Sequence, residues 1–547
     1  MKLTVICCIS ILERRKQLTL EHLEEQKEAK RLREAEVTRS ALKKLLKITV
    51  FIVQKKMAHT TNYEDLVRFI GEELEEEVLC EYINFTKLHK NATYLSTSSV
   101  TQFINVIGEW IKSKNIAKIR SSEEFTLLLD ESADEANRAE LSLIARVVDG
   151  WEIQNLFIEL VQLKECDARS IFDKVEGEFS KNNFDIINVK FAGMDGCSTM
   201  SGELNGVQAL FKTTSSHLSY IHCRNHRLAL CFAHLKGQFP EFLEYDSLLL
   251  NLFLVFKNST VRMSTFSDMQ ELYGMQSLKL IKAAVTRWLS HGKASQRVID
   301  RFMPLVSALD EIYRKRREPA IKGVRDQLVE PKMVALLCYL TDIIALTNDL
   351  QIFLQASRLN FLGIPKKVEA LLGKLREKIN NPSIPGSNFA KLDELLDALS
   401  LERDQLRQTR SFENFDKQTF LDKVAIPMTK ALMEEIVVAF RIPEHLAGFS
   451  CLDPELMPEE ALLQEYGNEH ITSLAEFYGE PYRVADSTSP PLVDRDALID
   501  EYQIFKTFVL GKRRKFDAKN QGSKRRKAVA GPSHQQTRTN KTNTERS

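Results

Sequence analysis

The chain has 547 residues, 43% of them hydrophobic, so it is too long for one ordinary domain and too apolar to be disordered throughout. Lys and Arg number 76 against 75 Asp and Glu, but residues 511–547 hold twelve basic and two acidic side chains, which leaves about −9 on the rest. This asymmetry excludes a surface that is basic everywhere and indicates a localised contact with nucleic acid or import machinery.

Cysteine usage and hydropathy exclude further classes. The nine cysteines form no Cys-x-x-Cys pair, which indicates free thiols in a reducing compartment. No apolar run approaches the roughly 20 residues that span a bilayer, so we expect no membrane partner. The apolar stretch from Leu3 to Leu12 lacks an Ala-x-Ala-like cleavage site and precedes dense charge, so an irregular or alternative N-terminus is favoured over a signal peptide.

The N-terminal part is predicted to be helical. Residues 1–57 are assigned to one long charged helix, which from residue 13 contains neither Gly nor Pro. No heptad is sustained in it, so a solvated helix is favoured over a coiled coil. Residues 58–119 are predicted to form a helical N-terminal region, with amphipathic helices over 63–81 and 100–113.

The character changes over residues 120–240. Short apolar runs predict five strands, at 125–130, 140–148, 151–163, 186–191 and 218–222. Asp149 and Gly150 separate the second run from the third, which is typical of a hairpin. Helices are expected over 167–180, from an N-cap at Ser201, and over 224–236. The order, three strands and then alternating helices and strands, is that of a ribonuclease H-like core.

The remaining chain is predicted to be mostly helical. Residues 241–440 are assigned to a helical insertion domain, with apolar stripes of helical period over 247–256, 294–314, 332–354, 365–379, 390–406 and 424–440. Residues 441–510 form an irregular region ending in a short helix over 495–510, and 511–547 a basic disordered tail. The predicted fold class is α+β: a ribonuclease H-like mixed sheet with a large all-α insertion and a helical N-terminal region.

Two carboxylates mark the ends of predicted strands. Asp130 and Asp195 each follow an apolar run. Polynucleotidyl transfer uses carboxylates in such places because Mg²⁺ prefers oxygen ligands, and two ions can stabilise the attacking and leaving oxygens together. Ordinary surface carboxylates also occur at strand ends, so the strands alone leave both interpretations open.

Four blocks resemble hAT-superfamily DNA transposases. Residues 127–134 resemble the block that carries the first catalytic Asp, and 194–202 the Asp-Gly block that carries the second. Residues 222–230 are similar to the family's Cys-x-x-His helix, and 286–290 to its Thr-Arg-Trp-x-Ser block, followed by His291 where the family usually has Arg. The resemblance covers roughly 120–440, and more weakly from 60.

This resemblance implies a degenerate active site. Asp130 and Asp195 would be vestigial catalytic residues that hold at most one Mg²⁺ weakly. The family's third carboxylate is a Glu in a C-terminal block, which also belongs to its dimerisation segment, and we find no such block or BED zinc finger. An active enzyme would need a substitute Glu, for example from the 440–500 region.

Cys223, His226, Cys231 and His234 suggest a zinc site by composition. On one helix the first and last of these residues lie about 16 Å apart, too far for one tetrahedral ion. Cys223 and His226 alone would need partners that the sequence does not identify. A structural role for both is favoured, which agrees with the view of this motif in the family.

Trp288 and Arg287 are the candidate DNA-binding residues. They lie among basic and polar side chains, including Lys282, His291 and Lys293. The resemblance implies that Trp288 stacks on a base exposed at a transposon end. Packing of the same indole between the insertion and the core is the equally weighted alternative.

The tail carries two basic clusters. Lys512 and Arg513 are separated by a spacer from Lys524, Arg525, Arg526 and Lys527, as in a bipartite nuclear-import signal. An unspecific nucleic-acid-binding tail is the alternative. The sequence thus favours a nuclear, transposon-derived protein that acts by binding DNA or proteins; an active Mg²⁺-dependent transposase or nuclease and a helical scaffold are the alternatives.

Overall fold

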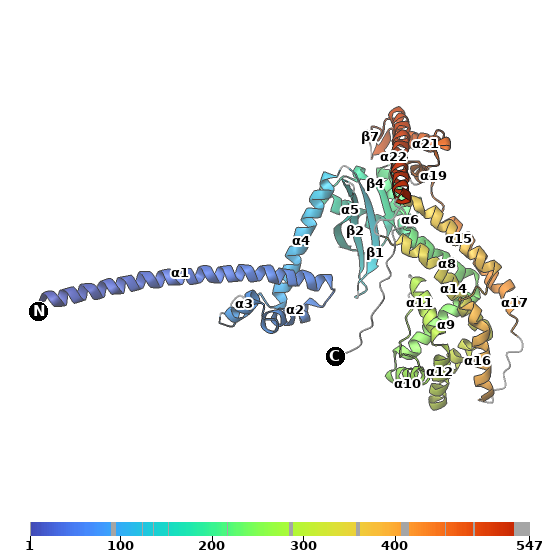
Figure 1. Ribbon diagram of the computed structural model, residues 1–547, viewed down its shortest axis with the longest axis horizontal. Coiled ribbons are helices and arrows are strands. Elements are labelled where there is room, and N and C mark those ends of the chain that lie inside the picture. The colour runs from blue at the N-terminus through green and yellow to red at the C-terminus, as the bar shows by residue number, and fades with distance from the viewer. Residues whose placement is uncertain are drawn as a thin grey trace. The chain divides into compact units, whose positions relative to one another are not determined.

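The structure, a computed structural model, describes residues 2–529 except 89–93, 123, 135, 151, 216, 284–287, 357–360, 406–414, 455 and 485–486. The chain divides into two compact units (Figure 1). One comprises residues 1–123 with 155–159, and the other 124–154 with 160–547.

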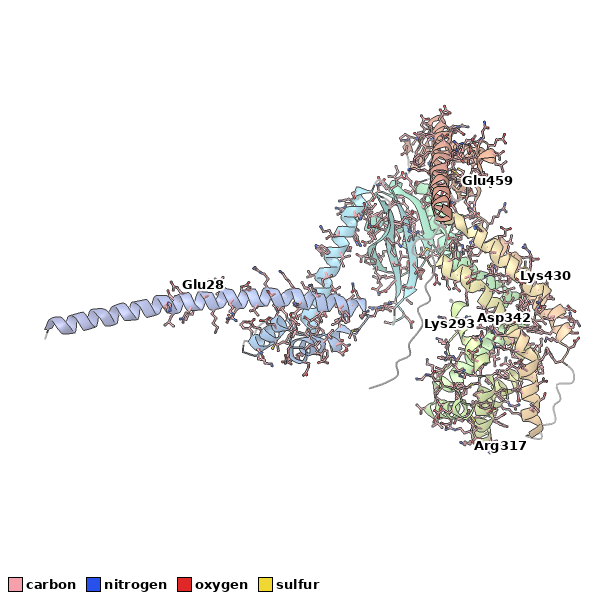
Figure 2. The ribbon with its side chains drawn as sticks, in the orientation of Figure 1. Glu28, Lys293, Arg317, Asp342, Lys430 and Glu459 are labelled. Atoms are coloured by element: carbon pink, nitrogen blue, oxygen red, sulfur yellow. The ribbon has the colours of Figure 1, made fainter. Side chains whose placement is uncertain are left out.

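The first unit is helical. It contains α1 (Lys2–Gln54), α2 (His59–Arg68), a π-helical turn (Phe69–Glu73), α3 (Glu77–Leu88) and α4 (Thr97–Ser121). Its core begins in α1 only at Ala41, and from there Leu45 and Ile52 pack with Tyr82 of α3. Upstream, side chains 22–33 of α1 are exposed, and Glu28 projects from the helix (Figure 2). The predicted solvated helix is therefore present.

One predicted helix in this unit is interrupted. The stretch expected to be helical from 63 to 81 splits into α2 and α3, because Glu75 adopts a left-handed backbone conformation with φ 53°. The acidic run from Glu72 to Glu77 spans this break. Lys44 of α1 pairs with Glu76 at 2.8 Å, so the acidic turn is fixed against α1.

The second unit is built on a five-stranded mixed sheet. The strands are β1 (Phe125–Ala133), β2 (Ala139–Asp149), β3 (Glu152–Gln162), β4 (Val189–Met194) and β5 (Ser219–His222). Their order in the sheet is β3-β2-β1-β4-β5, with β1 antiparallel to β2 and parallel to β4, and β4 parallel to β5 (Figure 1). The predicted order of strands and the α+β class are confirmed.

Two helices cover one face of this sheet. These are α5 (Ala168–Lys181) and α7 (Val207–Thr214). Phe179 of α5 lies 6.0 Å from Phe125 of β1, and Phe172 of α5 lies 5.1 Å from Phe211 of α7. Every second residue of β1, including Leu127 and Leu129, is buried. The residues between them therefore lie on the opposite face of the sheet.

The helix expected from Ser201 begins later. A short helix, α6 (Ser198–Ser201), ends at that residue, and α7 starts at Val207 after Gly206. A Cβ on Gly206 would lie 2.4 Å from the backbone nitrogen of Gly202, so the two glycines allow a tight turn between the helices. The prediction of an N-cap at Ser201 was wrong because its hydroxyl instead donates to the carbonyls of Gly196 and Cys197.

The helical domain follows the sheet. Its helices are α8 (Arg224–Gln238), α9 (Pro240–Lys257), α10 (Thr260–Leu272), α11 (Trp288–Asp300), α12 (Phe302–Arg316), α13 (Pro319–Leu328), α14 (Pro331–Leu354), α15 (Ile364–Asn380), α16 (Leu392–Gln405), α17 (Lys417–Phe420) and α18 (Ile426–Ala439). The helix predicted over 294–314 is two helices that break at Arg301. Among the described helices, α14 alone is long and apolar enough to span a bilayer, and 78% of that apolar window is buried, as in a core helix.

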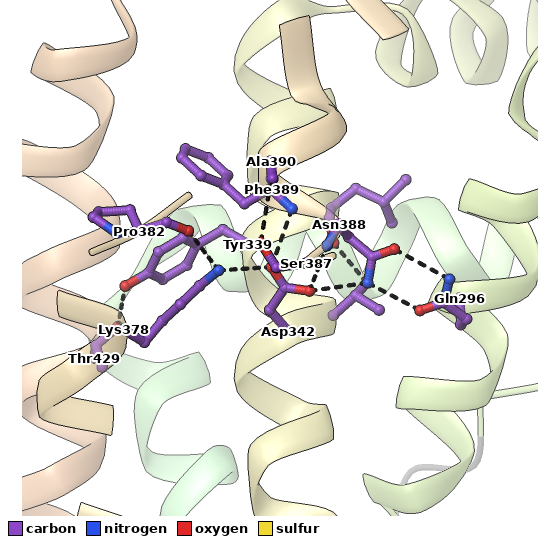
Figure 3. Close-up of polar contacts among 12 residues, drawn as sticks. Gln296, Tyr339, Asp342, Lys378, Pro382, Ser387, Asn388, Phe389, Ala390 and Thr429 are labelled. Carbon is purple, nitrogen blue, oxygen red and sulfur yellow. Dashed lines mark hydrogen bonds and ion pairs between the residues drawn. The ribbon is translucent and has the colours of Figure 1, made fainter. Parts of the chain in front are cut away.

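A buried polar cluster lies in this domain (Figure 3). Lys378 of α15 donates to Asp342 of α14 at 2.7 Å and to the carbonyl of Pro382 at 2.6 Å. Asp342 also accepts hydrogen bonds from the backbone N–H groups of Asn388 and Phe389, at 2.9 and 3.0 Å. The cluster therefore fixes the connection between α15 and α16 against the central helix α14.

The last region is more ordered than expected. It contains α19 (Glu444–Gly448), α20 (Glu460–Leu463), α21 (Asn468–Gly479), a hairpin of β6 (Tyr482–Val484) and β7 (Ser487–Ser489), and α22 (Arg495–Val529). Cys451, Leu474 and Tyr502 form part of its own small core. The helix expected to end at 510 continues to Val529, so the tail is helical at least that far.

Candidate functional site

Asp130 and Asp195 lie at the same edge of the sheet. Leu128 of β1 is paired with Gly193 of β4 in parallel register. Asp130 lies in β1 two residues after Leu128, and Asp195 directly follows β4 two residues after Gly193, so both aspartates lie where these neighbouring parallel strands end. Asp130 is exposed and Asp195 half-buried.

The loop after β4 holds Asp195 by its backbone. The carbonyl of Asp195 accepts a hydrogen bond from the hydroxyl of Tyr220 on β5 at 2.6 Å. Its carboxylate accepts a longer one from the backbone N–H of Cys197, at 3.4 Å. Burial and then the charge of Asp195 raise the pKa of Tyr220, so this phenol stays protonated and remains a donor.

Glu131 is a further carboxylate at this edge. Its hydrogen bond with Cys166 raises the pKa of that thiol. Burial, with Asp195 and Glu131, raises the pKa of Cys197. Both thiols are therefore held in their neutral form, which weakens them as nucleophiles or metal ligands. Sequence reasoning passed over Glu131, although it follows Asp130 directly.

A buried histidine packs under the Asp195 loop. A Cβ on Gly196 would lie 1.7 Å from Cε1 of His222, the last residue of β5, so only glycine allows this contact. His222 Nδ1 accepts from Arg227 Nε at 2.9 Å, and its buried Nε2 has no hydrogen-bond partner among the described residues. Burial, then Arg227, lowers the pKa of His222 to about 4.

Two arginines of α8 join the sheet region to the end of the helical domain. Arg224 donates to the carbonyl of Ala439 at 3.1 Å, and Arg227 donates to the same carbonyl at 3.4 Å. Ala439 is the last residue of α18, where the helix dipole favours positive charge. Arg224 is 8% exposed and lies over the ring of Phe361. Arg224 is therefore buried between the two regions, and Arg227 is half-buried beside it.

The residues around the aspartates do not fit a two-metal centre. Within the described parts of the chain, no group of three or more His, Cys, Asp and Glu side chains is placed to hold a metal ion. The region 440–500, where a substitute Glu was considered, packs against the other end of the strands. There Phe449 contacts Phe191, and Phe477 contacts His217, just before β5. Phe191 precedes Asp195 by about 13 Å of extended strand.

Asp134, the second aspartate of the first block, has a structural role. Its carboxylate accepts the backbone N–H groups of Ala136 and Arg138, both at 2.8 Å, and pairs with the Arg138 guanidinium. These contacts, led by the Arg138 backbone, hold the pKa of Asp134 below its usual range. Asp134 therefore fixes the turn between β1 and β2.

The four Cys and His residues of α8 do not converge. Cys223 is exposed at the start of the helix, and the His226 ring lies 5.5 Å from that of His222. Cys231 is buried, which raises the pKa of its thiol to about 12. His234 lies on the surface, 2.7 Å from a carboxylate oxygen of Glu435 on α18. The four residues therefore lie in separate environments, and the structural role of Cys223 and His226 stays a prediction.

The candidate DNA-binding residues lie largely outside the described part. Arg287 is among residues 284–287, and only the backbone of Trp288 is described, at the start of α11. His291 had been counted in the same basic surface, but it is 1% exposed and bonded to Asp246 at 2.9 Å. That hydrogen bond is the largest cause of the lowered pKa of Asp246. Lys293, in contrast, is exposed (Figure 2).

One residue of the first basic cluster of the tail is hydrogen-bonded to the loop before α20. Arg513 donates to the carbonyls of Met457 and Pro458, at 2.9 and 2.8 Å. Lys512 is exposed, with its ammonium over the Phe508 ring. Lys524, Arg525, Arg526 and Lys527 lie in α22, and their side chains are outside the described set.

The sheet order, with Asp130 in β1 and Asp195 directly after β4, is that of an RNase-like α+β domain. Residues 13–206 match the family model DUF4371, described as the ZMYM1/FAM200 RNase-like domain. The matched segment begins within α1, includes Asp130 and Asp195, and ends before α7. The match relates this chain to transposase-derived proteins.

Proposed function

We propose that this chain is a hAT transposase-derived nuclear protein that acts by binding DNA or proteins and does not cut or join DNA. The observation that supports the proposal is that Asp130 in β1 and Asp195 directly after β4 lie at the ends of neighbouring parallel strands, while the described residues contain no group of three or more side chains that could hold a metal ion. The four sequence blocks support the finer assignment to the hAT superfamily.

The chemistry of phosphate displacement supports the lack of activity. Mg²⁺ is usually held by one or two carboxylates together with water and substrate phosphate, so Asp130 and Asp195 supply protein ligands for one ion and leave a second ion without its own. In a two-ion mechanism one ion stabilises the attacking oxygen and the other the leaving oxygen. Each 1.36 kcal/mol of transition-state stabilisation that is lost lowers the rate about tenfold. Glu131 does not replace the third carboxylate, since it directly follows Asp130 in β1 and successive side chains of a strand point to opposite faces of the sheet.

The contacts of the Asp-Gly block give a reason for its survival without catalysis. Gly196 is needed for packing on His222, and the backbone of Asp195 is bonded to Tyr220. Asp134 likewise serves the hairpin. These parts of the transposase-like blocks stabilise the sheet whether or not the chain acts on DNA.

The test is a DNA cleavage and strand-transfer assay of the full chain with Mg²⁺ or Mn²⁺. We expect no activity above that of Asp130→Ala and Asp195→Ala variants. Glu203→Ala, in an exposed turn, is the matched control. Activity that both aspartate variants abolish and the control retains would overturn the proposal. Cross-linking of the chain in nuclei, followed by recovery of bound DNA and protein, would identify the partner class.

A further inference from the structure

A cavity of about 240 Å³ opens on the helical domain between the end of α9 and the start of α10. It is far from the strand-end carboxylates in the sequence and shares no residue with them. Its walls are mostly apolar and are formed by Phe253, Phe256, Met263 and Leu280. The volume is below the 300–1,000 Å³ or so that is typical of small-molecule sites. It suits a single aromatic or aliphatic side chain.

The rim of the cavity is positively charged. Lys257 and Lys279 line it, both are exposed, and neither makes an ion pair with a described residue. The Lys257 ammonium lies 5.7 Å from the centre of the Phe253 ring. The cavity also borders the N-terminus of the thirteen-residue helix α10, where backbone N–H groups favour negative charge.

Apolar surface continues from the cavity along α9. Leu250 and Leu254 precede Lys257 by two turns and one turn, and they are 44% and 42% exposed. Exposed leucines at this spacing form a strip on one side of the helix. Phe253 and Lys257 line the cavity next to this strip, so an extended or helical segment can place one side chain in the cavity and others on the strip.

We propose that this cavity is a docking site for an acidic segment of a partner protein, with one aromatic or aliphatic side chain inserted and flanking carboxylates paired with Lys257 and Lys279. Charge complementarity selects this occupant: the rim has two lysines and a helix N-terminus. An apolar anchor in a pocket surrounded by polar contacts is the usual form of a binding hot spot. This proposal depends on the proposed function only because both require that the chain acts by binding a partner.

The probe is a pool of fluorescein-labelled octapeptides, each with Leu or Phe at the centre and Asp or Glu on both sides. Matched peptides carry Ser at the centre or Lys on both sides. Fluorescence anisotropy with the full chain should show saturable binding of the acidic apolar peptides, with Kd values of about 1–100 μM. The Ser and Lys peptides should bind at least about tenfold more weakly.

Two protein variants locate the site. K257E/K279E should weaken binding by about tenfold or more, whereas K423E/K430E, with the same charge change at exposed lysines, should change it less than about twofold. Met263→Trp should block the cavity, and circular dichroism and Tm would show that each variant is folded. No saturable binding, or binding unchanged in K257E/K279E, would overturn the proposal. Oligonucleotide binding lost only in K257E/K279E would assign the site to nucleic acid and overturn it as well. The DNA cleavage assay is unaffected by either result.

Discussion

At the scale of single residues, the Gly196–His222 contact explains part of the Asp-Gly block. The imidazole occupies the space that any Cβ at position 196 would need. Gly196 is therefore required by packing, and an Asp-Gly pair in this place is no measure of catalytic competence. The sequence contained both residues, but their contact joins a loop after β4 to the end of β5, and no local pattern predicts it.

His222 makes the stability of the second unit depend on pH. Its pKa is lowered from 6.5 to about 4, so the unfolded state takes up the proton first as the pH falls. Stability is then lost as the pH decreases from about 6.5 to about 4. Between pH 7 and pH 5 this loss is about 2 kcal/mol. Urea denaturation at the two pH values measures it.

A His222→Gln variant should lose most of this pH dependence, because its amide does not titrate. His470→Gln is the matched control, since His470 is exposed on α21. If the difference in unfolding free energy between the two pH values is the same in both variants, His222 is not the group responsible.

At the scale of elements, the strands were more predictable than the helix ends. Apolar runs and the Asp149–Gly150 turn allowed the first three strands to be placed within a few residues. Other boundaries were missed: α7 starts only after the close turn between Gly202 and Gly206, and the helix predicted over 294–314 breaks at Arg301. The sequence predicted those features of the candidate site that follow from the pairing of the strands. It did not predict the contacts of Glu131 and His222.

The Asp342–Lys378 pair should be asymmetric in its effect on stability. Asp342→Ala leaves the buried charge of Lys378 without its counter-ion and the N–H groups of Asn388 and Phe389 without their acceptor, and should cost about 3–5 kcal/mol. Lys378→Met keeps the hydrocarbon stem and leaves Asp342 with its backbone donors. It should cost clearly less, because burial already lowers the pKa of Lys378.

Denaturant unfolding of the two variants tests this difference. Hydrogen exchange should also increase over residues 382–391 in Asp342→Ala. Lys374→Met, on an exposed pair with Asp349, is the control. Equal losses in Asp342→Ala and Lys378→Met would mean that the ion pair dominates and the backbone contacts contribute little.

Arg513 should stabilise the C-terminal region more than Lys512 does. Its guanidinium is bonded to backbone carbonyls of the 454–458 loop, and a hydrogen bond to a charged group contributes about 1.5–3 kcal/mol. We expect Arg513→Ala to increase hydrogen exchange over residues 449–466. Lys512→Ala, one position earlier and exposed, should leave that exchange unchanged, and a matching increase there would contradict the assigned role.

At the scale of the whole molecule, charge is concentrated in the tail. Deleting residues 511–547 removes about +10 and should move the protein from the nucleus to the cytoplasm, as imaging of a fluorescent fusion would show. Arg513 is held by the 454–458 loop, so Lys524 to Lys527 should provide most of the import signal. Alanine at those four positions should have nearly the same effect as the deletion. Unchanged nuclear accumulation in both variants would refute an import role.

The two arginines on the Ala439 carbonyl have a consequence for how such a chain can change. They hold the exit of the helical domain beside its entry, because α8 leads into the domain and α18 leads out of it. Insertion of one domain into another is tolerated where the ends of the inserted segment lie close together. We therefore expect that the segment between α8 and α18 can be lengthened or exchanged for another helical domain while the sheet still folds.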